Sequence, residues 1–465
     1  MTATDFLDHD RRGAAEAVRV PDNPLESLHV THTTRFYLLA ALIGALVGLL
    51  AAGFQIGISQ AIAVCRVVVR HAETMLSVPA WLAAAVLTVA MLLAALYLVR
   101  RIAPEAGGSG VHEVEAHLDG DEPMRWHRVV PAKFVGGVLT LGAGATVGPE
   151  GPAVHMGGAV GRMVATLFAQ TGAHGKALVC AGAAAGLAAV FSAPIAGFLF
   201  ILEQMRRHFT LTDISFHGLV IASWSGAIVA ALFFGQAPAF PVPRYASPAV
   251  LDLTLFVLLG AMIGAFGTLF NRVLLATLAA CDRVRTRHPY ALVLPVGLAT
   301  GVLFTTLPAT VGTGQALTLQ LFQQSFAWQT LLLLLAVRLV TTIGTYASGV
   351  PGGIFAPLLA LGALAGLLAG HLFGALFPGL VAAPGIYALA AMGALFAATF
   401  RLPLTAIVLV LEITRSASVA MAIVGSCLAA SLTAHVLGAT PLYEVLLDRL
   451  RVGKRTAEAE SIPDL

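Results

Sequence analysis

The segment GPEGP at residues 148–152 places one carboxylate, Glu150, between two apolar runs that are typical of membrane helices. Glycine and proline on both sides prevent a regular helix from continuing through this position. Non-helical backbone at membrane depth survives only where it is buried in protein or lines a cavity. An ionisable residue at that depth is a functional-site candidate. The pattern therefore predicts that Glu150 handles an ion or a proton.

Three Gly-rich breaks each precede an apolar helix: GGSG at 107–110, GPEGP at 148–152 and GGIFAP at 352–357. The start of a helix exposes unpaired backbone N–H groups at the positive end of the helix dipole. Such a start binds an anion without needing a basic side chain. None of the three breaks contains Lys or Arg. This absence favours a small anion that is held weakly and leaves again.

Two interpretations of Glu150 follow. An ionised carboxylate competes with the anion for the same N–H groups, and protonation removes that competition, so proton uptake is linked to anion passage. Alternatively, Glu150 is an ordinary carboxylate that caps a helix N-terminus. We favour the gate because the segment is expected inside a membrane.

The composition supports a membrane setting. Of 465 residues, 58% are hydrophobic and only 11% are charged, whereas roughly a quarter of the residues in a soluble protein are charged. The net charge of +3 is small and spread out, so no nucleic-acid partner is expected. The cysteines lack the spacing of a metal site, and we expect neither a metal nor a cofactor. We expect buried free thiols at Cys65, Cys180, Cys281 and Cys427.

Apolar stretches follow one another from residue 36 to residue 438. Because a spanning helix needs about 20 apolar residues, we expect an all-α, multi-pass membrane protein with roughly ten or more spans. The membrane domain, 36–445, would lie between a cytosolic N-terminal segment, 1–35, and a short cytosolic tail, 446–465, with no room for a soluble regulatory domain. No secretory signal is visible. Cytosolic termini are predicted from the flanking residues Arg11, Arg12, Arg19, Arg35, Arg449, Arg451, Lys454 and Arg455.

An internal repeat divides the membrane domain into halves at about 36–235 and 249–445. Residues 133–161 align without a gap on residues 338–366, and residues 191–204 align on residues 400–413. In the first pair, Thr140, Gly144, Gly148, Pro152, Gly157 and Gly161 match Thr345, Gly349, Gly353, Pro357, Gly362 and Gly366. Duplicated halves with broken helices in corresponding positions are typical of a transporter with a site at mid-membrane.

Five motifs in this order resemble the CLC family of chloride channels and chloride/proton exchangers, in the prokaryotic form without CBS domains. They are GSGVHEVE (108–115), GPEGP (148–152), FILEQM (200–205), GGIFAP (352–357) and PLY (441–443). The resemblance runs from about residue 35 to about residue 450. It implies an inverted-repeat bundle of tilted and broken helices. It also implies a homodimer in the bacterial inner membrane, with one pore in each subunit.

The resemblance also implies the site. The hydroxyls of Ser109 and Tyr443 and the amides of Ile354 and Phe355 would bind a central chloride. Glu150 would be the external gate. The amides of the outer site would come from Gly148, Pro149, Glu150 and Gly151. Without the resemblance, Ser109 would be a turn residue or helix cap, and Tyr443 an interfacial anchor.

Three positions depart from the family pattern. His112 replaces a proline, and Pro149 replaces an arginine and removes one amide donor beside the gate. Gln204 stands where exchangers carry an internal proton-handling glutamate, and glutamine cannot carry a proton. We therefore expect pH-dependent chloride transport with weakened or absent proton coupling. The alternative is a coupled antiporter that uses a water wire past Gln204, with Glu203 either a relay or a structural residue matched by Glu412.

Other functions are less well supported. HEVEAH (112–117) resembles a zinc-protease motif, but its histidines are five residues apart and point about 140° from each other on a helix. We therefore expect His112 and His117 to be interfacial or loop histidines and the protein not to be an enzyme. A non-transporting scaffold gives no reason for three helix starts without basic residues. Among anions, nitrate and fluoride are the rivals, and the retained Ser109 favours chloride over fluoride.

Overall fold

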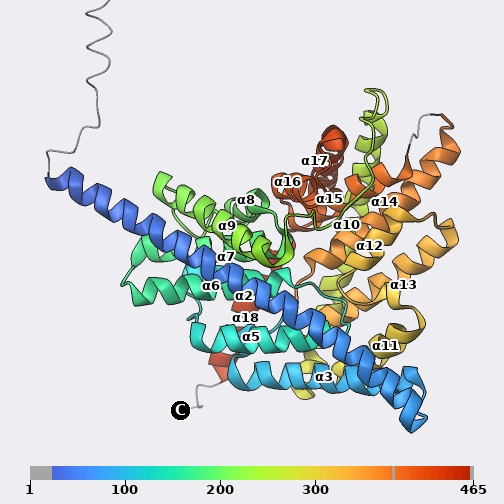
Figure 1. The fold of residues 1–465 in the computed structure, drawn as a ribbon, viewed down its shortest axis with the longest axis horizontal. Helices are drawn as coiled ribbons and strands as arrows, with labels where there is room; N and C mark the ends of the chain where they lie inside the picture. Colours follow the sequence, from blue (N-terminus) through green and yellow to red (C-terminus); the bar gives the residue numbers. More distant parts are fainter. Residues whose placement is uncertain (1–23, 380–382, 461–465) are drawn as a thin grey trace, which may run out of the picture.

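The computed structural model describes residues 24–379 and 383–460, and this part of the chain contains helices and no β-strand. The long helix α2 runs diagonally across the whole body in Figure 1. The α-helices are α2 (Pro24–Leu76), α3 (Ala80–Ile102), α4 (Val111–Asp119), α5 (Trp126–Gly142), α6 (Glu150–Leu167), α7 (Gly172–Phe191), α8 (Pro194–Gln204), α9 (Asp213–Phe234), α10 (Leu253–Arg287), α11 (Val293–Thr306), α12 (Gln315–Gln323), α13 (Trp328–Ala347), α14 (Phe355–Leu376), α15 (Pro384–Phe400), α16 (Pro403–Thr414), α17 (Ala420–Val436) and α18 (Leu442–Glu460). Three short 3₁₀ helices accompany them: η1 (Pro104–Ala106), η2 (Pro308–Thr310) and η3 (Ala417–Val419).

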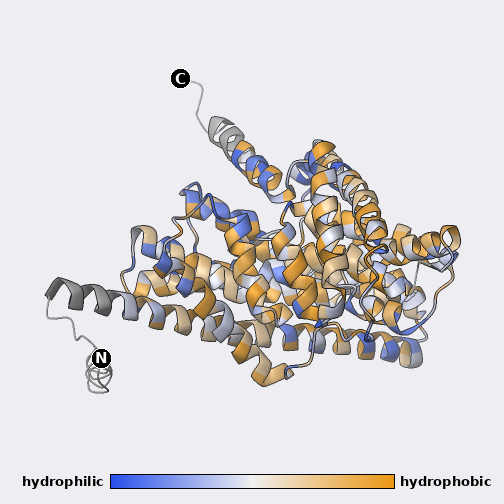
Figure 2. Ribbon diagram, turned by 90° about the horizontal axis from the view of Figure 1, so that it is seen from above, coloured by the Kyte–Doolittle hydropathy of each residue, from blue (hydrophilic) through white to orange (hydrophobic). Residues whose placement is uncertain are grey.

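The described residues hold eight helices that are long and apolar enough to cross a membrane, and hydrophobic residues cover much of the helical body (Figure 2). These are α2, α3, α7, α9, α10, α13, α14 and α17, the last together with η3. Four shorter apolar helices accompany them: α8, α11, α15 and α16. The protein is thus an all-α, multi-pass membrane protein, and its described residues supply eight long apolar helices and four shorter ones where ten or more spans were expected.

The difference arises because apolar stretches break into shorter helices. Helix α7 ends at a residue with left-handed backbone, Ser192 (φ 52°), and α8 begins at Pro194. In the second half, α15 ends before Arg401 (φ 63°), and α16 begins at Pro403. A left-handed residue ends a helix, and proline suits the first turn of the next one. The same break therefore occurs at matching places of the repeat.

Matching glycines let helices approach closely in both halves. A Cβ atom at Gly157 of α6 would lie 2.2 Å from the carbonyl oxygen of Gly182 in α7. A Cβ atom at the repeat-related Gly362 of α14 would lie 2.6 Å from the carbonyl oxygen of Ala391 in α15. Only glycine permits such backbone contact. The repeated glycines therefore hold together the helix pairs that carry the two main breaks.

Helices run through the inner ends of both expected terminal segments, whose cytosolic assignment stays a prediction. Residues 1–23 and 461–465, with Arg11, Arg12 and Arg19, lie outside the described residues. Helix α2 begins at Pro24, so the membrane domain does not begin a new element at residue 36. Helix α18 continues to Glu460, so the expected tail begins within this helix, which projects from the helical body (Figure 2).

Candidate functional site

The three Gly-rich breaks meet inside the protein and are joined by backbone hydrogen bonds. Gly148 N donates to Gly353 O at 2.8 Å, and Gly353 N donates to Gly148 O at 2.7 Å. Gly352 N donates to Gly108 O at 2.9 Å. Segments from both halves of the repeat thus form one site, in which three backbone hydrogen bonds join the breaks. The sequence predicted the breaks, and the structure brings them together.

Glu150 is fully buried and is the first residue of α6. Its Oε1 accepts hydrogen bonds from Phe355 N at 2.6 Å and from Ala356 N at 3.3 Å, at the start of α14. Within the described part of the chain, Oε2 has no hydrogen-bond partner. The Glu150 carboxylate therefore accepts hydrogen bonds from the N-terminal amides of α14, a helix in the opposite half of the repeat. We call Phe355 N, Ala356 N and the backbone of 148–151 the amide cradle.

Glycines on both sides of Glu150 leave room for its carboxylate and for the neighbouring loop. A Cβ atom at Gly148 would lie 2.0 Å from Oε2 of Glu150. A Cβ atom at Gly151 would lie 2.6 Å from Oγ of Ser109. Pro149 is the residue before α6, with φ −78° and ψ −15°, a conformation that suits proline. The predicted outer-site residues thus surround the Glu150 side chain closely.

Ser109 and Tyr443 lie together although 334 positions separate them in the chain. Oγ of Ser109 is 3.2 Å from the hydroxyl oxygen of Tyr443, and both residues are fully buried. The Tyr443 ring stacks on Phe400 with centroids 4.9 Å apart and contacts Phe355 at 5.9 Å. Tyr443 is therefore buried inside the protein and is not the interfacial anchor that its place near the end of a span would otherwise suggest. Two hydroxyls lie beside the start of α14, where Ile354 precedes the first turn.

A buried lysine positions the loop that carries Ser109. Nζ of Lys133 donates to the carbonyl oxygens of Ala106 (3.0 Å), Gly107 (3.1 Å) and Gly108 (2.8 Å). The repeat-related Arg338 donates in the same way to the carbonyl oxygens of residues 311 and 312 in the other half. Sequence analysis missed this role, although a single lysine within the apolar run 129–147 was a signal.

Glu203 caps a helix of the opposite half of the repeat. Its Oε1 accepts from Leu404 N at 3.1 Å, and its Oε2 accepts from Thr405 N at 2.6 Å, at the start of α16. Its repeat counterpart Glu412 accepts from Ile195 N at 3.1 Å and from Ala196 N at 2.7 Å, at the start of α8. Each half thus caps a helix of the other, which supports the structural interpretation of Glu203.

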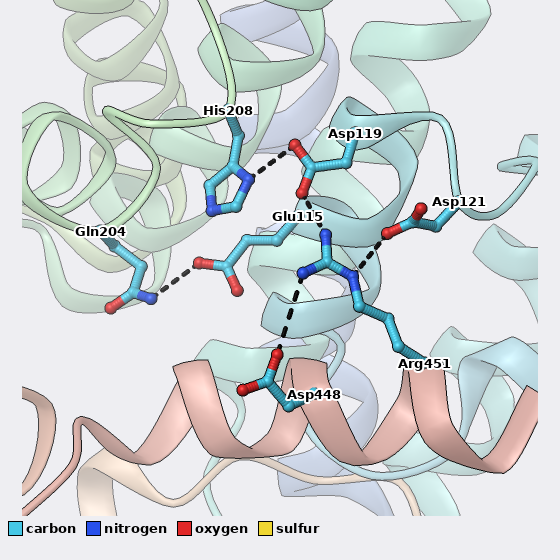
Figure 3. A network of polar contacts seen from close by, with 7 residues as sticks. All are labelled: Glu115, Asp119, Asp121, Gln204, His208, Asp448 and Arg451. Carbon is cyan, nitrogen blue, oxygen red and sulfur yellow. Dashed lines mark hydrogen bonds and ion pairs between the residues drawn. The ribbon is translucent and has the colours of Figure 1, made fainter.

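Gln204 instead contacts a carboxylate that the sequence analysis did not single out. Its Nε2 donates to Oε1 of Glu115 in α4 at 2.7 Å (Figure 3). Burial raises the pKa of Glu115 from its ordinary 4.5 to about 8, although the Gln204 hydrogen bond lowers it. Helix α4 is not among the membrane-spanning helices. Gln204 itself binds no proton, but it lies beside Glu115, a carboxyl group with a pKa of about 8.

The two histidines of HEVEAH lie in helix α4 and not in a loop, and both are partly buried. The His112 ring stacks on Tyr443 at 6.4 Å, and its Nε2 is 3.2 Å from Oε1 of Glu113. Nδ1 of His117 lies 2.9 Å from the carbonyl oxygen of Glu122. Because the two histidines are five residues apart on the helix, their rings contact different neighbours.

Comparisons with known proteins agree with one another. The sequence model of the family described as "Voltage gated chloride channel" matches residues 91–435. The chain is 38% identical over 436 residues to the H⁺/Cl⁻ exchange transporter ClcA of Vibrio parahaemolyticus, with 92% of this chain and 93% of that relative covered. It is 40% identical over 436 residues to the H⁺/Cl⁻ exchange transporter ClcA of Cronobacter sakazakii, with 92% of each covered. The crystal structure of a slow cyanobacterial Cl⁻/H⁺ antiporter matches with a TM-score of 0.85 at 34% identity, covering 90% of this chain and 98% of that one.

Proposed function

Because the chain belongs to the CLC family of voltage gated chloride channels, we propose that it exchanges chloride for protons across the membrane. The observation that carries the proposal is the Glu150 carboxylate on Phe355 N and Ala356 N. Those two amides form a binding site for one negative charge, and a protein carboxylate occupies it. A permeating anion must displace this carboxylate, so chloride passage and the protonation of Glu150 are linked.

The steps follow from charge. Ionised Glu150 holds the amide cradle and excludes chloride, since both compete for the same N–H donors. A proton neutralises the carboxylate, weakens these hydrogen bonds and lets the side chain leave. Chloride then enters the amide cradle and moves on to the hydroxyls of Ser109 and Tyr443. While it is out of the cradle, Glu150 loses its proton to water on the outer side and then returns to the amides as a carboxylate, so the proton has moved opposite to the chloride.

We therefore propose coupled exchange of chloride for protons in place of the weakened or absent proton coupling that Gln204 had led us to expect. Two observations support this revision: the relatives are named exchange transporters, and Gln204 adjoins Glu115, whose carboxyl group can hold a proton. Chloride remains the proposed anion because Ser109 is retained and its hydroxyl lies with that of Tyr443 beside the amide cradle. Nitrate and fluoride are tested as replacements in the same assay.

The exchange is tested with the purified full chain in proteoliposomes, by measuring the reversal potential under an imposed pH gradient. We expect a reversal potential displaced from the chloride equilibrium potential, and a chloride gradient that drives protons uphill. Glu150→Gln mimics the protonated gate, so this variant should carry chloride alone, with a flux that no longer rises as pH falls. A parent protein that reverses at the chloride equilibrium potential is a passive conductor, and no chloride flux at all rejects transport.

We further propose a homodimer in the bacterial inner membrane with both termini in the cytosol. The basic residues that flank the first and last spans, among them Arg35 and Arg449, support the cytosolic position of the termini. The proposal of a homodimer rests on membership of the CLC family. A C-terminal tag that becomes accessible to protease only after the inner membrane is opened would agree with this orientation. Cross-linking in membranes that yields monomers alone would reject the dimer.

A further inference from the structure

Glu115 is a buried carboxyl group that the gate itself does not use. It lies on α4, whose preceding loop carries Ser109, and only 1% of its surface is exposed. Gln204 approaches from the end of α8 and donates its amide hydrogen to Oε1 at 2.7 Å. A buried carboxyl group is costly when ionised, so a fold that keeps one beside the transport path suggests a use for it.

The groups around Glu115 favour its protonated form. Acidic side chains act on it from two helices: Glu113 and Asp119 from α4, and Glu444 from α18. The nearby guanidinium of Arg451 is bound by other acids, with Asp119 at 2.6 Å and Asp121 at 2.7 Å (Figure 3). In the segment after α8, His208 lies 2.8 Å from Asp119 and Arg207 lies 3.5 Å from Glu444. Like charges nearby raise proton affinity, in the same direction as burial.

Glu115 has a partly exposed neighbour and also acts on a residue of the anion site. One turn further along α4, the side chain of Asp119 is 24% exposed, and its partner His208 is 15% exposed, so water reaches this end of the helix. The carboxylates of Glu115 and Glu150 both act electrostatically on the hydroxyl of Tyr443. Glu115 thus combines a water-accessible neighbour with an electrostatic partner that it shares with the gate.

We propose that Glu115 is the internal proton-binding residue of this protein and that Gln204 positions it. This inference rests on the proposed exchange. Glu115 takes a proton from water at the Asp119 end of α4 and becomes a neutral acid. It then gives the proton, through water beside Tyr443, to the ionised Glu150 and returns to a carboxylate. Gln204 binds no proton, and its hydrogen bond fixes the direction of the Glu115 carboxyl group.

Two neighbouring carboxylates are less suited to this role. Both oxygens of Glu203 accept hydrogen bonds from the first amides of α16. Oε1 of Glu113 lies 3.2 Å from Nε2 of His112, so its near neighbour is a histidine and not Gln204. Glu113 is therefore a matched control, since it is a second poorly exposed carboxylate of the same helix that does not contact Gln204.

The test measures chloride efflux and proton uptake in parallel for the full chain in proteoliposomes. Glu115→Gln keeps the shape and a hydrogen-bonding partner for Gln204 but removes the titrating group. We expect loss of chloride-driven proton uptake with chloride efflux retained, and a reversal potential that moves to the chloride equilibrium potential. Glu113→Gln should exchange as the parent does. The double variant Glu115→Gln with Gln204→Glu returns a carboxyl group to the pair and should regain proton uptake.

The outcomes separate the two proposals. A parent without coupled proton uptake refutes exchange itself. A parent and a Glu115→Gln variant that couple alike refute only the role of Glu115, as does equal loss of coupling in Glu113→Gln. If Glu115→Gln does not yield folded protein, Glu115→Asp replaces it. This change draws the carboxyl group away from Gln204 and should slow proton uptake more than chloride efflux, and equal slowing of both fluxes rejects the inference.

Discussion

Lys133 illustrates how one buried charge shapes a site that it does not enter. Its ammonium group satisfies three carbonyl oxygens in the loop before Ser109. The basic residue thus lies behind the backbone rather than in the amide cradle. An anion near Ser109 meets a hydroxyl, while the cation that orders the loop is already hydrogen-bonded elsewhere. This arrangement agrees with weak, reversible anion binding.

Lys133→Met should destabilise the protein and weaken chloride transport together. The change leaves buried carbonyl oxygens without a donor, which costs about 1–3 kcal/mol for each unsatisfied group. The loop that holds Ser109 should then loosen and lower the affinity for chloride. Thermal unfolding in detergent and chloride efflux measure the two effects.

Arg338→Met provides the matched control because Arg338 binds the corresponding loop of the other half, away from Ser109. It should lower the unfolding temperature with chloride affinity retained. A Lys133→Met variant with the chloride affinity of the parent would contradict the positioning role of Lys133.

At the scale of elements, the sequence predicts where helices begin but not which side chains from other helices contact those starts. Gly and Pro place the breaks at 148–152 and 352–357 correctly, because these residues limit where a helix begins. Periodicity does not reveal that Glu150 binds the amides of α14 or that Gln204 meets Glu115. Such contacts join positions 205 and 89 residues apart and depend on how helices cross. The family resemblance named Ser109 and Tyr443 where local chemistry alone gave other roles.

Glu203 and Glu412 form reciprocal caps, so each should contribute to stability rather than to proton transfer. Glu203→Gln and Glu412→Gln each weaken the cap on a helix of the opposite half, which costs about 0.5–2 kcal/mol. We expect lower unfolding temperatures in both variants and an unchanged ratio of protons to chloride. If Glu203→Gln abolishes proton uptake without slowing chloride, Glu203 is the relay and our assignment of Glu115 is wrong.

At the scale of the whole molecule, Glu115 links stability to pH. Its pKa rises from 4.5 in the ordinary state to about 8 in the folded protein, chiefly through burial. Above pH 4.5 the folded state therefore binds more protons than the unfolded state, and the free energy of unfolding falls as pH rises. The contribution is complete at low pH and is lost as pH passes about 8.

Glu115→Gln should consequently flatten this decline. Between pH 5 and pH 8, the parent should lose more unfolding temperature than the variant, because glutamine does not titrate. Thermal scans of both proteins in the same detergent across this range, roughly 3 pH units, measure the difference. Parallel curves would show that Glu115 is already ionised in the folded protein at neutral pH.

Backbone hydrogen bonds join Gly148 to Gly353 and Gly352 to Gly108, and they affect the rate at which the site can release and bind ions. Because these bonds hold the amide cradle rigid, the part left to move is the Glu150 side chain. Exposed side chains change rotamer within nanoseconds, whereas Glu150 is fully buried and leaves only when its hydrogen bonds to the amides of α14 break. In the proposed exchange, protonation weakens these bonds, so the interval between ions would be set by how long a proton takes to reach Glu150 and to leave it.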